Sequence, residues 1–231
     1  TLRKCNIIVL LLYIQMSSDA FVCVIDLETD DKIANAPGRR REEQIGNLQF
    51  TCCSVFCIDV ESIMSENPTD TSGRGMRTFW RSNAKDITEM LALFEKATAI
   101  VGYNLFGFDW LVLKKHYQDK CQYHKHLFKT LDVFSRVRDV ISHWPKLDTL
   151  LKSNGLTPKT GDGLEAIKLF RDGRYVELQS YCEADVMACT HLALLPSMTV
   201  VIAIHSLTLT VPGYVFNIRS FLSGLIAHHE R

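Results

Sequence analysis

The sequence has no apolar run long enough to cross a membrane, no excess of charge of one sign and no internal repeat. The early apolar run from Ile7 to Ile14 is much shorter than the ~20 residues that a transmembrane helix needs. Lysine plus arginine and aspartate plus glutamate both number 26, so the net charge identifies no class of partner. Because this apolar run is so short, we expect no membrane association. With 231 residues, 47% of them hydrophobic, the chain is long enough for a substantial globular core.

The eight cysteines lack the spacing of a disulfide scaffold. Cys52, Cys53 and Cys57, for example, lie within one apolar, strand-like run, where thiols act as small hydrophobic groups. This use of cysteine indicates a reducing compartment, so we expect an intracellular protein that is not secreted, with cytoplasm, nucleus and organelle left open. A metal site at Cys121, His124 and His126 is not favoured, because no second ligand pair follows at zinc-finger spacing.

Composition divides the chain into three parts. Residues 1–15 combine a basic start with a short apolar run, which faintly resembles a secretion signal, but no A-x-A-like cleavage site follows. We expect residues 1–15 to be an N-terminal extension and residues 16–197 to form the main domain. Residues 198–231 are predicted to be a β-rich C-terminal extension of uncertain role.

The most informative stretch is Phe21–Thr29, in which five apolar residues run into Asp26-Leu-Glu28. This pattern predicts a buried central strand. Because successive side chains of a strand point to opposite faces, Asp26 and Glu28 lie on the same face. Neighbouring carboxylates at the end of a buried strand repel each other, and a divalent cation is the usual remedy. The alternative is that the strand simply ends here and both acids are solvated.

The other elements follow from hydrophobic periodicity and from turn residues. Three antiparallel-looking strands are followed by strand–helix units and then by helices, which predicts an α/β sheet with helices on its faces. Further strands are expected at Leu48–Val60, Met76–Trp80, Ala97–Tyr103 and His126–Val133, and loops at 29–47 and 62–75. Helices are expected at 83–96, 110–117, 135–141, 145–152, 164–171 and 175–195.

Three more candidate residues lie near the carboxyl ends of strands or on a helix. Asp109 comes just after the strand Ala97–Tyr103, at a helix start, while Tyr181 and Asp185 share one face of the last helix. Sites in α/β sheets form at the carboxyl ends of strands. Each residue taken alone has a simpler explanation. Asp109 would be an acid favoured by the helix dipole, Asp185 a solvated residue and Tyr181 a half-buried core residue. Those readings do not explain why all of these residues and the two acids of the first strand occur together.

These residues lie in three motifs that resemble those of DEDD-type (DnaQ-like) 3′–5′ exonucleases of the ribonuclease H-like superfamily. The motifs are Asp26-Leu-Glu28, Asn104-x-x-x-Phe108-Asp109 and Tyr181-x-x-x-Asp185, in the family's order. A tyrosine four residues before the last aspartate is similar to the DEDDy subgroup. The stretches around Lys146, Lys159 and Tyr181 look like its stand-alone, proofreading-type branch. The resemblance covers about Phe21 to Leu195 and implies a mixed five-stranded ribonuclease H-like sheet flanked by helices, occupying residues 16–197.

The resemblance implies a metal-dependent 3′–5′ exonuclease acting on single-stranded or frayed nucleic acid, with DNA favoured and roles in repair or proofreading. Two divalent cations, Mg²⁺ or Mn²⁺, would activate the attacking water and stabilise the leaving 3′ oxygen. Carried over by motif, the metal ligands would be Asp26, Glu28, Asp109 and Asp185. Tyr181 would orient or help activate the water.

Substrate contacts are expected from Thr29, Asn104, Phe108 and Lys159. Asn104 fixes a turn or contacts a nucleotide, and Phe108 packs or stacks near the terminal nucleotide. Leu105 and Phe106 either wedge against bases or pack in the core. Six basic residues either form a lining that contacts the phosphates of the bound nucleic acid or belong to ordinary solvated surface. They are Lys146, Lys152, Lys159, Lys168, Arg171 and Arg174.

The expected partner is single-stranded DNA or RNA with a free 3′ end. Any polymerase or helicase partner would be a separate chain, and the oligomeric state is left open. The alternative function is a non-catalytic nucleic-acid-binding or scaffold module on the same fold, within a replication, repair or RNA-processing assembly. Loss of one of the acids would have favoured that alternative, and all four are present.

Overall fold

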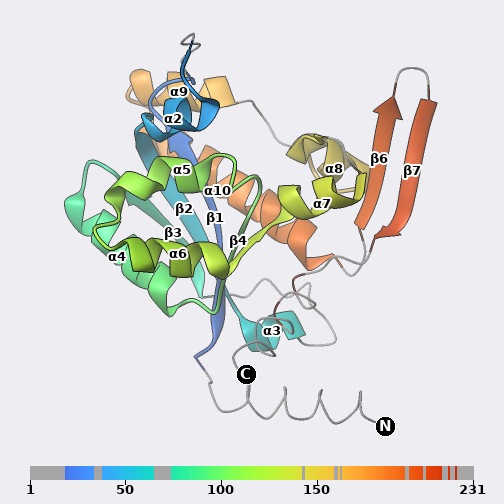
Figure 1. Ribbon diagram of the computed structural model, residues 1–231, viewed down its shortest axis with the longest axis horizontal. Coiled ribbons are helices and arrows are strands. Elements are labelled where there is room, and N and C mark those ends of the chain that lie inside the picture. Colours follow the sequence, from blue (N-terminus) through green and yellow to red (C-terminus); the bar gives the residue numbers. More distant parts are fainter. Residues whose placement is uncertain are drawn as a thin grey trace.

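The protein is built around a five-stranded mixed sheet with helices on both faces (Figure 1). The strand order is β3-β2-β1-β4-β5. The central strand β1 pairs antiparallel with β2 and parallel with β4, while β3 is antiparallel to β2 and β5 is parallel to β4. The computed structural model describes residues 19–33, 38–64, 74–141, 144–158, 161, 163–195, 198–204, 207–214, 218 and 222.

The strands of the main sheet are β1 (Phe21–Thr29), β2 (Phe50–Asp59), β3 (Gly75–Trp80), β4 (Ala99–Gly102) and β5 (Thr130–Asp132). The helices are α2 (Arg41–Gly46), α3 (Val60–Met64), α4 (Ala84–Lys96), α5 (Asp109–Leu113), the 3-10 turn η1 (Lys114–His116), α6 (Lys120–Phe128), α7 (Val133–Ile141), α8 (Leu147–Ser153), α9 (Gly163–Arg171) and α10 (Tyr175–Leu194). This arrangement confirms the predicted α/β fold, a mixed five-stranded sheet flanked by helices.

Strand β1 divides its side chains between two hydrophobic cores. Its odd-numbered apolar residues, from Phe21 to Leu27, pack in one cluster with α4, α5 and α6. Val22 and Val24 instead pack in a second cluster that includes α7, α8 and α10. Asp26 and Glu28 continue this even-numbered series, so the alternation of the strand points both acids toward the α10 side.

Three of the expected elements are corrected by the structure. The predicted loop 29–47 contains helix α2, because Ile45 is buried against the core beside α5 and acidic residues favour the first turn of this helix. The predicted strand His126–Val133 is reduced to Thr130–Asp132, since His126 belongs to helix α6. The side chain of His126 is fully buried there and bonds to Tyr117 and Glu95. Residues 62–64 of the second predicted loop belong to α3.

The β-rich tail contains the antiparallel hairpin of β6 (Met198–Ile204) and β7 (Leu207–Tyr214), which is separate from the main sheet. The hairpin lies beside α8 (Figure 1). The expected extension 1–15 lies outside the described residues, and the division into 1–15, 16–197 and 198–231 stays a prediction. Among the described residues, no helix is both long and apolar enough to cross a bilayer.

Candidate active site

A cavity of about 380 Å³ lies where β1, the end of β4 and helix α10 meet. All five predicted catalytic residues line it, together with two of the predicted substrate contacts. These seven are Asp26, Glu28, Asn104, Phe108, Asp109, Tyr181 and Asp185. Residues up to 159 positions apart in the chain, from 26 to 185, thus share one cavity. Their catalytic and binding roles stay predictions at this point.

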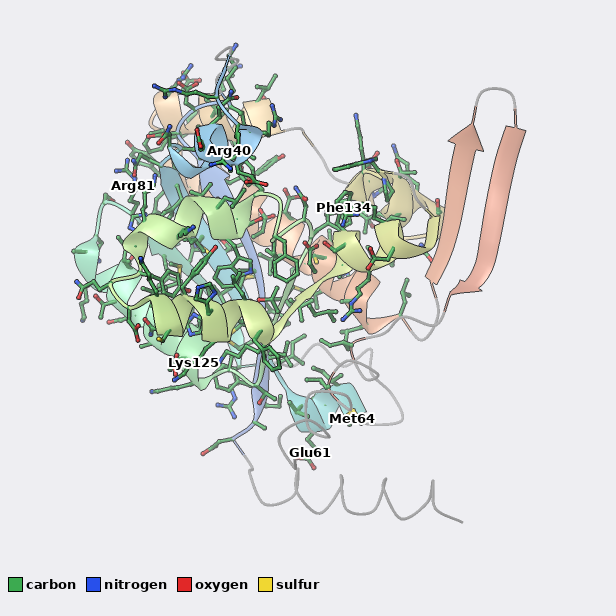
Figure 2. All side chains as sticks on the ribbon, viewed as in Figure 1. Arg40, Glu61, Met64, Arg81, Lys125 and Phe134 are labelled. Atoms are coloured by element: carbon green, nitrogen blue, oxygen red, sulfur yellow. The ribbon has the colours of Figure 1, made fainter. Side chains whose placement is uncertain are left out.

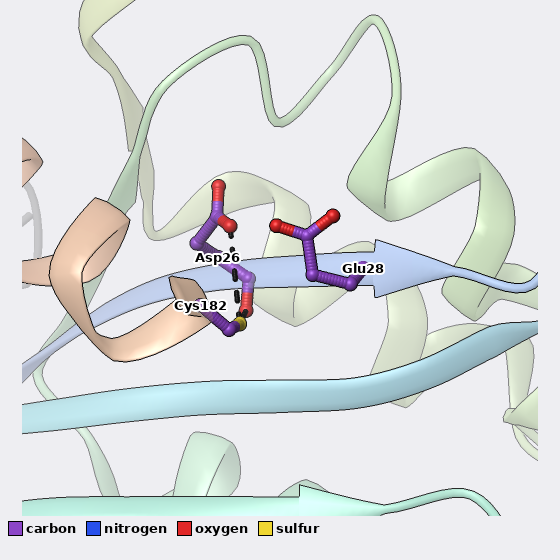
Figure 3. Close-up of side chains that lie close together, drawn as sticks. All are labelled: Asp26, Glu28 and Cys182. Atoms are coloured by element: carbon purple, nitrogen blue, oxygen red, sulfur yellow. Dashed lines mark hydrogen bonds between the residues drawn. The ribbon is translucent and has the colours of Figure 1, made fainter. Parts of the chain in front are cut away.

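Asp26 and Glu28 project from the same side of β1, as the alternation of the strand requires (Figure 3). Glu28 is buried, while Asp26 is half-buried. Cys182 of α10 packs against this pair, with its Sγ atom 3.4 Å from the Asp26 carbonyl oxygen and 3.9 Å from Oδ2. Each of the three residues offers one potential ligand atom, and these three atoms lie within 4.8 Å of one another. The helix therefore lies directly on the strand that carries the acids.

Asp109 is an acid of the cavity whose pKa is strongly perturbed. Its side chain is buried at the start of α5, and burial raises its pKa well above the usual range because the charged form loses its hydration. The neighbouring Asp26 raises the pKa of Asp109 further by repulsion, and Asp132 adds to this effect. Hydrogen bonds from the backbone amides of Asp109 and Leu27 act in the opposite direction. Without a cation, this cavity therefore opposes full ionisation of its acids.

The loop between β4 and α5 is held in shape by Asn104 and by the buried Asp132. Asn104 has a φ of 63°, a left-handed conformation that asparagine tolerates better than most residues. Its side chain folds back over the turn, so a Cβ atom on Gly107 would lie only 2.3 Å from Asn104 Oδ1. The Asp132 carboxylate accepts hydrogen bonds from the backbone amides of Asn104 (2.8 Å) and Phe106 (3.1 Å). The left-handed backbone of Asn104 thus belongs to the turn, and its expected contact with a nucleotide stays a prediction.

Asp132 was missed by the sequence analysis, although a signal for it existed. It lies at the carboxyl end of the parallel strand β5, the same kind of position that drew attention to Asp109. Its carboxylate also accepts from the backbone amide of Phe134 (3.1 Å) and the hydroxyl of Ser135 (3.1 Å). Asp132 therefore joins the loop that leads to Asp109 to the start of α7.

Tyr181 and Asp185 lie on one face of α10, one turn apart, as their spacing predicted. Both side chains are buried. Gly161 packs on the ring of Tyr181, because a Cβ atom at position 161 would lie 3.0 Å from Cε2 of the tyrosine. The ring is therefore confined between its own helix and the segment that precedes α9.

The other predicted contacts are placed less directly. Thr29 is buried at the end of β1, where its hydroxyl donates to the carbonyl oxygen of Asp31 (3.0 Å), and it is not among the residues that line the cavity. Leu105 packs in the core rather than as a wedge, while Phe106 is 42% exposed. Lys159 lies outside the described residues.

Several members of the predicted basic lining form ion pairs with acids of the chain itself. Lys152 pairs with Asp148, Arg171 with Asp31 and Arg174 with Glu177. A phosphate group would have to compete with these partners, so a continuous basic lining stays a prediction. The disfavoured metal site at Cys121, His124 and His126 gains no support, since the potential metal cluster within the described residues lies at Asp26, Glu28 and Cys182.

The structure adds aromatic residues to the cavity that the sequence analysis did not select. Tyr103, Phe134 and Trp144 line the cavity together with Pro145 and Leu147. They come from the end of β4, the start of α7 and the segment before α8. No spacing rule connects these positions, so only the fold reveals that they line the same cavity as the acids.

The burial of Asp109 predicts a distinctive pH dependence of stability. In the metal-free protein, folding raises the pKa of Asp109 above the value of about 3.9 expected for an unfolded chain. The folded state then binds more protons than the unfolded state between these two pKa values. The contribution of Asp109 to stability is consequently fully present below pH ~4 and is lost as the pH rises through the folded-state pKa.

Urea unfolding in the presence of a chelator, compared between wild type and Asp109→Asn at several pH values, measures this contribution. The free energy of unfolding of wild type minus that of the variant should fall as the pH rises from about 4. Acids that do not interact with Asp109 cancel in the difference, which therefore reports Asp109 together with its repulsion by neighbouring acids such as Asp26. Asp19→Asn, at a position 92% exposed, serves as the surface control. A difference that stays flat or increases with pH would contradict the raised pKa.

Comparison with known proteins gives one family match and a set of similar folds. Residues 67–195, more than half of the chain, match the family model described as the RNase H superfamily. A structure of exonuclease I aligns with a TM-score of 0.49 and 16% identity, over 76% of this chain and 40% of that chain. A complex of E. coli exonuclease I with a 5cy-dT13 oligonucleotide gives a TM-score of 0.48 and 16% identity, over 76% and 40%. The chain thus spans about 40% of the length of these structures, and no curated protein sequence matches it.

Proposed function

Since the chain belongs to the RNase H superfamily, we propose that it is a metal-dependent nuclease, and more narrowly a 3′–5′ exonuclease. The observation that carries this proposal is the convergence of Asp26, Glu28, Asp109 and Asp185, with Tyr181, on one cavity. Three of these four acids are buried. Clustered buried carboxylates are costly unless a cation or a proton neutralises them, so the arrangement is better suited to binding metal than to stabilising the fold.

The donor set fits hard divalent cations. Four carboxylates offer oxygen ligands, which suit Mg²⁺ and Mn²⁺, and the raised pKa of Asp109 shows that its charged form is costly unless a cation compensates it. Asp26, Glu28, Asp109 and Asp185 would hold the ions. When bound, two such cations supply Lewis-acid stabilisation for in-line attack on a phosphodiester. The buried thiol of Cys182 lies beside this donor set, with its Sγ atom 3.9 Å from Asp26 Oδ2.

The remaining residues of the chain position the substrate and the nucleophile. The ring of Tyr181, held by Gly161 and one turn from Asp185, would orient the attacking water, as in the DEDDy subgroup. Asn104 keeps the β4–α5 loop in the conformation that presents Asp109. Phe108, at the cavity wall just before α5, would pack against the sugar or base of the bound nucleotide.

The size of the cavity supports action at a chain end. A volume of about 380 Å³ is near the small end of the range for ligand sites and suits a single nucleotide. We therefore propose that the terminal nucleotide of a single or frayed strand enters the cavity, with DNA as the favoured substrate. Discrimination between DNA and RNA rests on contacts at the 2′ position, so experiment must compare the two.

A time course on 5′-labelled single-stranded DNA and on its RNA counterpart tests this function. With Mg²⁺ or Mn²⁺ we expect a ladder that shortens from the 3′ end, and EDTA should abolish it. An oligonucleotide with a blocked 5′ end and a free 3′ end should be degraded, while one blocked at its 3′ end should persist. No cleavage of either polymer by the folded protein, with any of these ions, would reject the nuclease in favour of a binding module on the same fold.

A further inference from the structure

Two cysteines face each other across the first two strands of the sheet. Strands β1 and β2 are antiparallel neighbours (Figure 1), and their register places Cys23 directly opposite Cys57. The two Sγ atoms lie 3.7 Å apart, although the residues are 34 positions apart in the chain. Both side chains are buried in the same core cluster, on the face of β1 that does not carry Asp26 and Glu28. The pair therefore lies outside the cavity of the proposed active site.

The backbone at this pair suits a disulfide bond. The amide of Val60 donates to the carbonyl oxygen of Ala20 (2.9 Å), so these opposite residues form a hydrogen-bonded pair. Such pairs alternate with non-hydrogen-bonded ones along antiparallel strands, and Cys23 and Cys57, three positions further, are of the second kind. Their Cα atoms should consequently lie about 4.5 Å apart, within the range of about 4.4–6.8 Å that disulfides span. A bridge therefore needs little movement of the backbone.

Cys57 is the more reactive thiol of the pair. The hydrogen bond from Cys23 lowers the pKa of the Cys57 thiol, because it stabilises the thiolate, and the positive charges of Arg74 and Arg77 lower this pKa further. Burial and the charge of Asp59 act in the opposite direction. The pKa of Cys23, in contrast, is raised by its bond to Cys57 and by burial. Since the thiolate is the nucleophile in thiol oxidation, Cys57 attacks first and Cys23 remains a donor.

The position beside Cys57 is open to a small molecule. On its other side, Cys57 lies opposite Gly75 of the edge strand β3, which carries no side chain. A Cβ atom at position 75 would meet no atom of the described residues within 4 Å. Cys57 keeps 4% of its surface exposed, whereas Cys23 and Cys53 are completely buried. A small oxidant thus reaches Cys57 before the other two thiols.

We propose that Cys57 and Cys23 form a reversible disulfide bond between β2 and β1 when the protein meets an oxidant of the peroxide class. The Cys57 thiolate attacks one oxygen of hydrogen peroxide, which gives a sulfenic acid on Cys57 and releases hydroxide. The thiol of Cys23 then attacks this sulfur, its proton leaves with the hydroxyl group as water, and the S–S bond forms. The two thiols lose two electrons, and the peroxide becomes two molecules of water once hydroxide takes up the proton that Cys57 had lost. A dithiol reductant reverses the bond by thiol–disulfide exchange.

The bridge fastens the strand that carries the acids. It joins β1 to β2 three residues before Asp26, on the opposite face of the strand. In reducing compartments, disulfides are usually transient ones of this kind, which respond to oxidants. Because the bond closes a long loop of the unfolded chain, the oxidised protein should unfold at a higher temperature than the reduced protein. This inference is independent of the proposed nuclease function.

Peptide mapping of the full chain without reduction tests the assignment. The folded protein is treated with hydrogen peroxide, free thiols are blocked with N-ethylmaleimide, and the digest is analysed by mass spectrometry. We expect a peptide pair joined through Cys23 and Cys57, which dithiothreitol separates. Free Cys57 should disappear roughly tenfold faster than free Cys53. The melting temperature of the oxidised protein should be about 5 °C or more above that of the reduced protein.

Two variants separate the roles of the two thiols. Cys23→Ala removes the second thiol, so the sulfenic acid on Cys57 should persist and be trapped by dimedone. Cys57→Ala should prevent the bridge and leave Cys23 reduced. Cys53→Ala is the matched control, because Cys53 is buried in the same core cluster but lies opposite Leu27 rather than a cysteine. This control should form the bridge as wild type does.

The assignment is overturned if wild type keeps both thiols free after peroxide treatment, or if Cys57 joins a different cysteine. Equal yield of the bridge in urea-unfolded protein would also overturn it, because the fold would then not select the pair. Wild type alone decides these outcomes, so a variant that fails to fold does not affect the test.

Discussion

Replacing Asp26 by asparagine is expected to lower the rate of 3′-end cleavage by roughly 10³-fold while the protein remains folded. Asparagine keeps the size of the side chain but removes the charge that a divalent cation would need. Metal ions contribute several kcal/mol of charge stabilisation in the transition state, and each 1.36 kcal/mol corresponds to a factor of ten in rate. The initial rate of shortening of a 5′-labelled strand at saturating Mg²⁺ measures the loss.

The stability of this variant distinguishes loss of function from loss of fold. Asp26 raises the pKa of the buried Asp109 by repulsion, so removing its charge should leave the metal-free protein at least as stable as wild type. Asp19→Asn provides the same chemical change at an exposed position near the opposite end of β1, paired with Arg74 only at 3.8 Å, and should retain full activity. Cleavage by Asp26→Asn within tenfold of wild type would remove Asp26 from the metal site.

Replacing Asp132 by asparagine is expected to have the largest effect on stability. Its carboxylate accepts four hydrogen bonds of 3.1 Å or less, from the amides of Asn104, Phe106 and Phe134 and from the hydroxyl of Ser135. An asparagine side chain presents an NH₂ group on one side, where it would face donors instead of accepting from them. The free energy of unfolding should fall by about 3 kcal/mol, since hydrogen bonds to charged groups contribute about 1.5–3 kcal/mol each. For a protein of this size, that lowers the melting temperature by roughly 6–12 °C.

The cleavage activity of Asp132→Asn should also fall, by about tenfold or more, at a temperature where the variant is fully folded. Asp132 touches no reacting group, but it holds the loop that presents Asp109. Asp119→Asn is the matched control, because Asp119 caps α6 by accepting from the amide of Cys121 (2.7 Å), and asparagine caps a helix equally well. Equal melting temperatures for Asp132→Asn and wild type would show that the network of Asp132 contributes little.

The parts of the fold that the sequence predicted are those that local patterns determine. The apolar run of β1 and the capped helix after Asn83 carry strong signals, because alternation and helix capping depend on neighbouring residues alone. The strand predicted at His126 failed for the opposite reason. Its residues are apolar enough for a strand, but hydrogen bonds of His126 with Tyr117, nine residues earlier, and with Glu95, 31 residues earlier, favour helix α6.

The residues of the candidate site also fall into two groups, those that local patterns predict and those that only tertiary contacts place. Asp26, Glu28, Asp109, Tyr181 and Asp185 were selectable because each lies at a fixed spacing within a motif, and the structure gathers them around one cavity. Trp144 belongs to no motif, and its place in the cavity lining depends on tertiary contacts such as the bond between Tyr103 and Pro145, which joins the end of β4 to the segment before α8. The chemistry of a site is thus partly local in sequence, whereas the shape of its walls depends on tertiary contacts.

The division of β1 between two cores makes the strand sensitive to parity. Removing one residue between Val22 and Asp26 would reverse the parity of the positions after the deletion relative to those before it. The two acids would then point toward the core that contains Phe94 and Trp110, while Val22 kept its own face. Removing two residues would shorten the strand but keep every side chain on its own face. We therefore expect the strand to tolerate insertions or deletions of two residues but not of one. The position of the acids thus depends on the number of residues in the strand as much as on their chemistry.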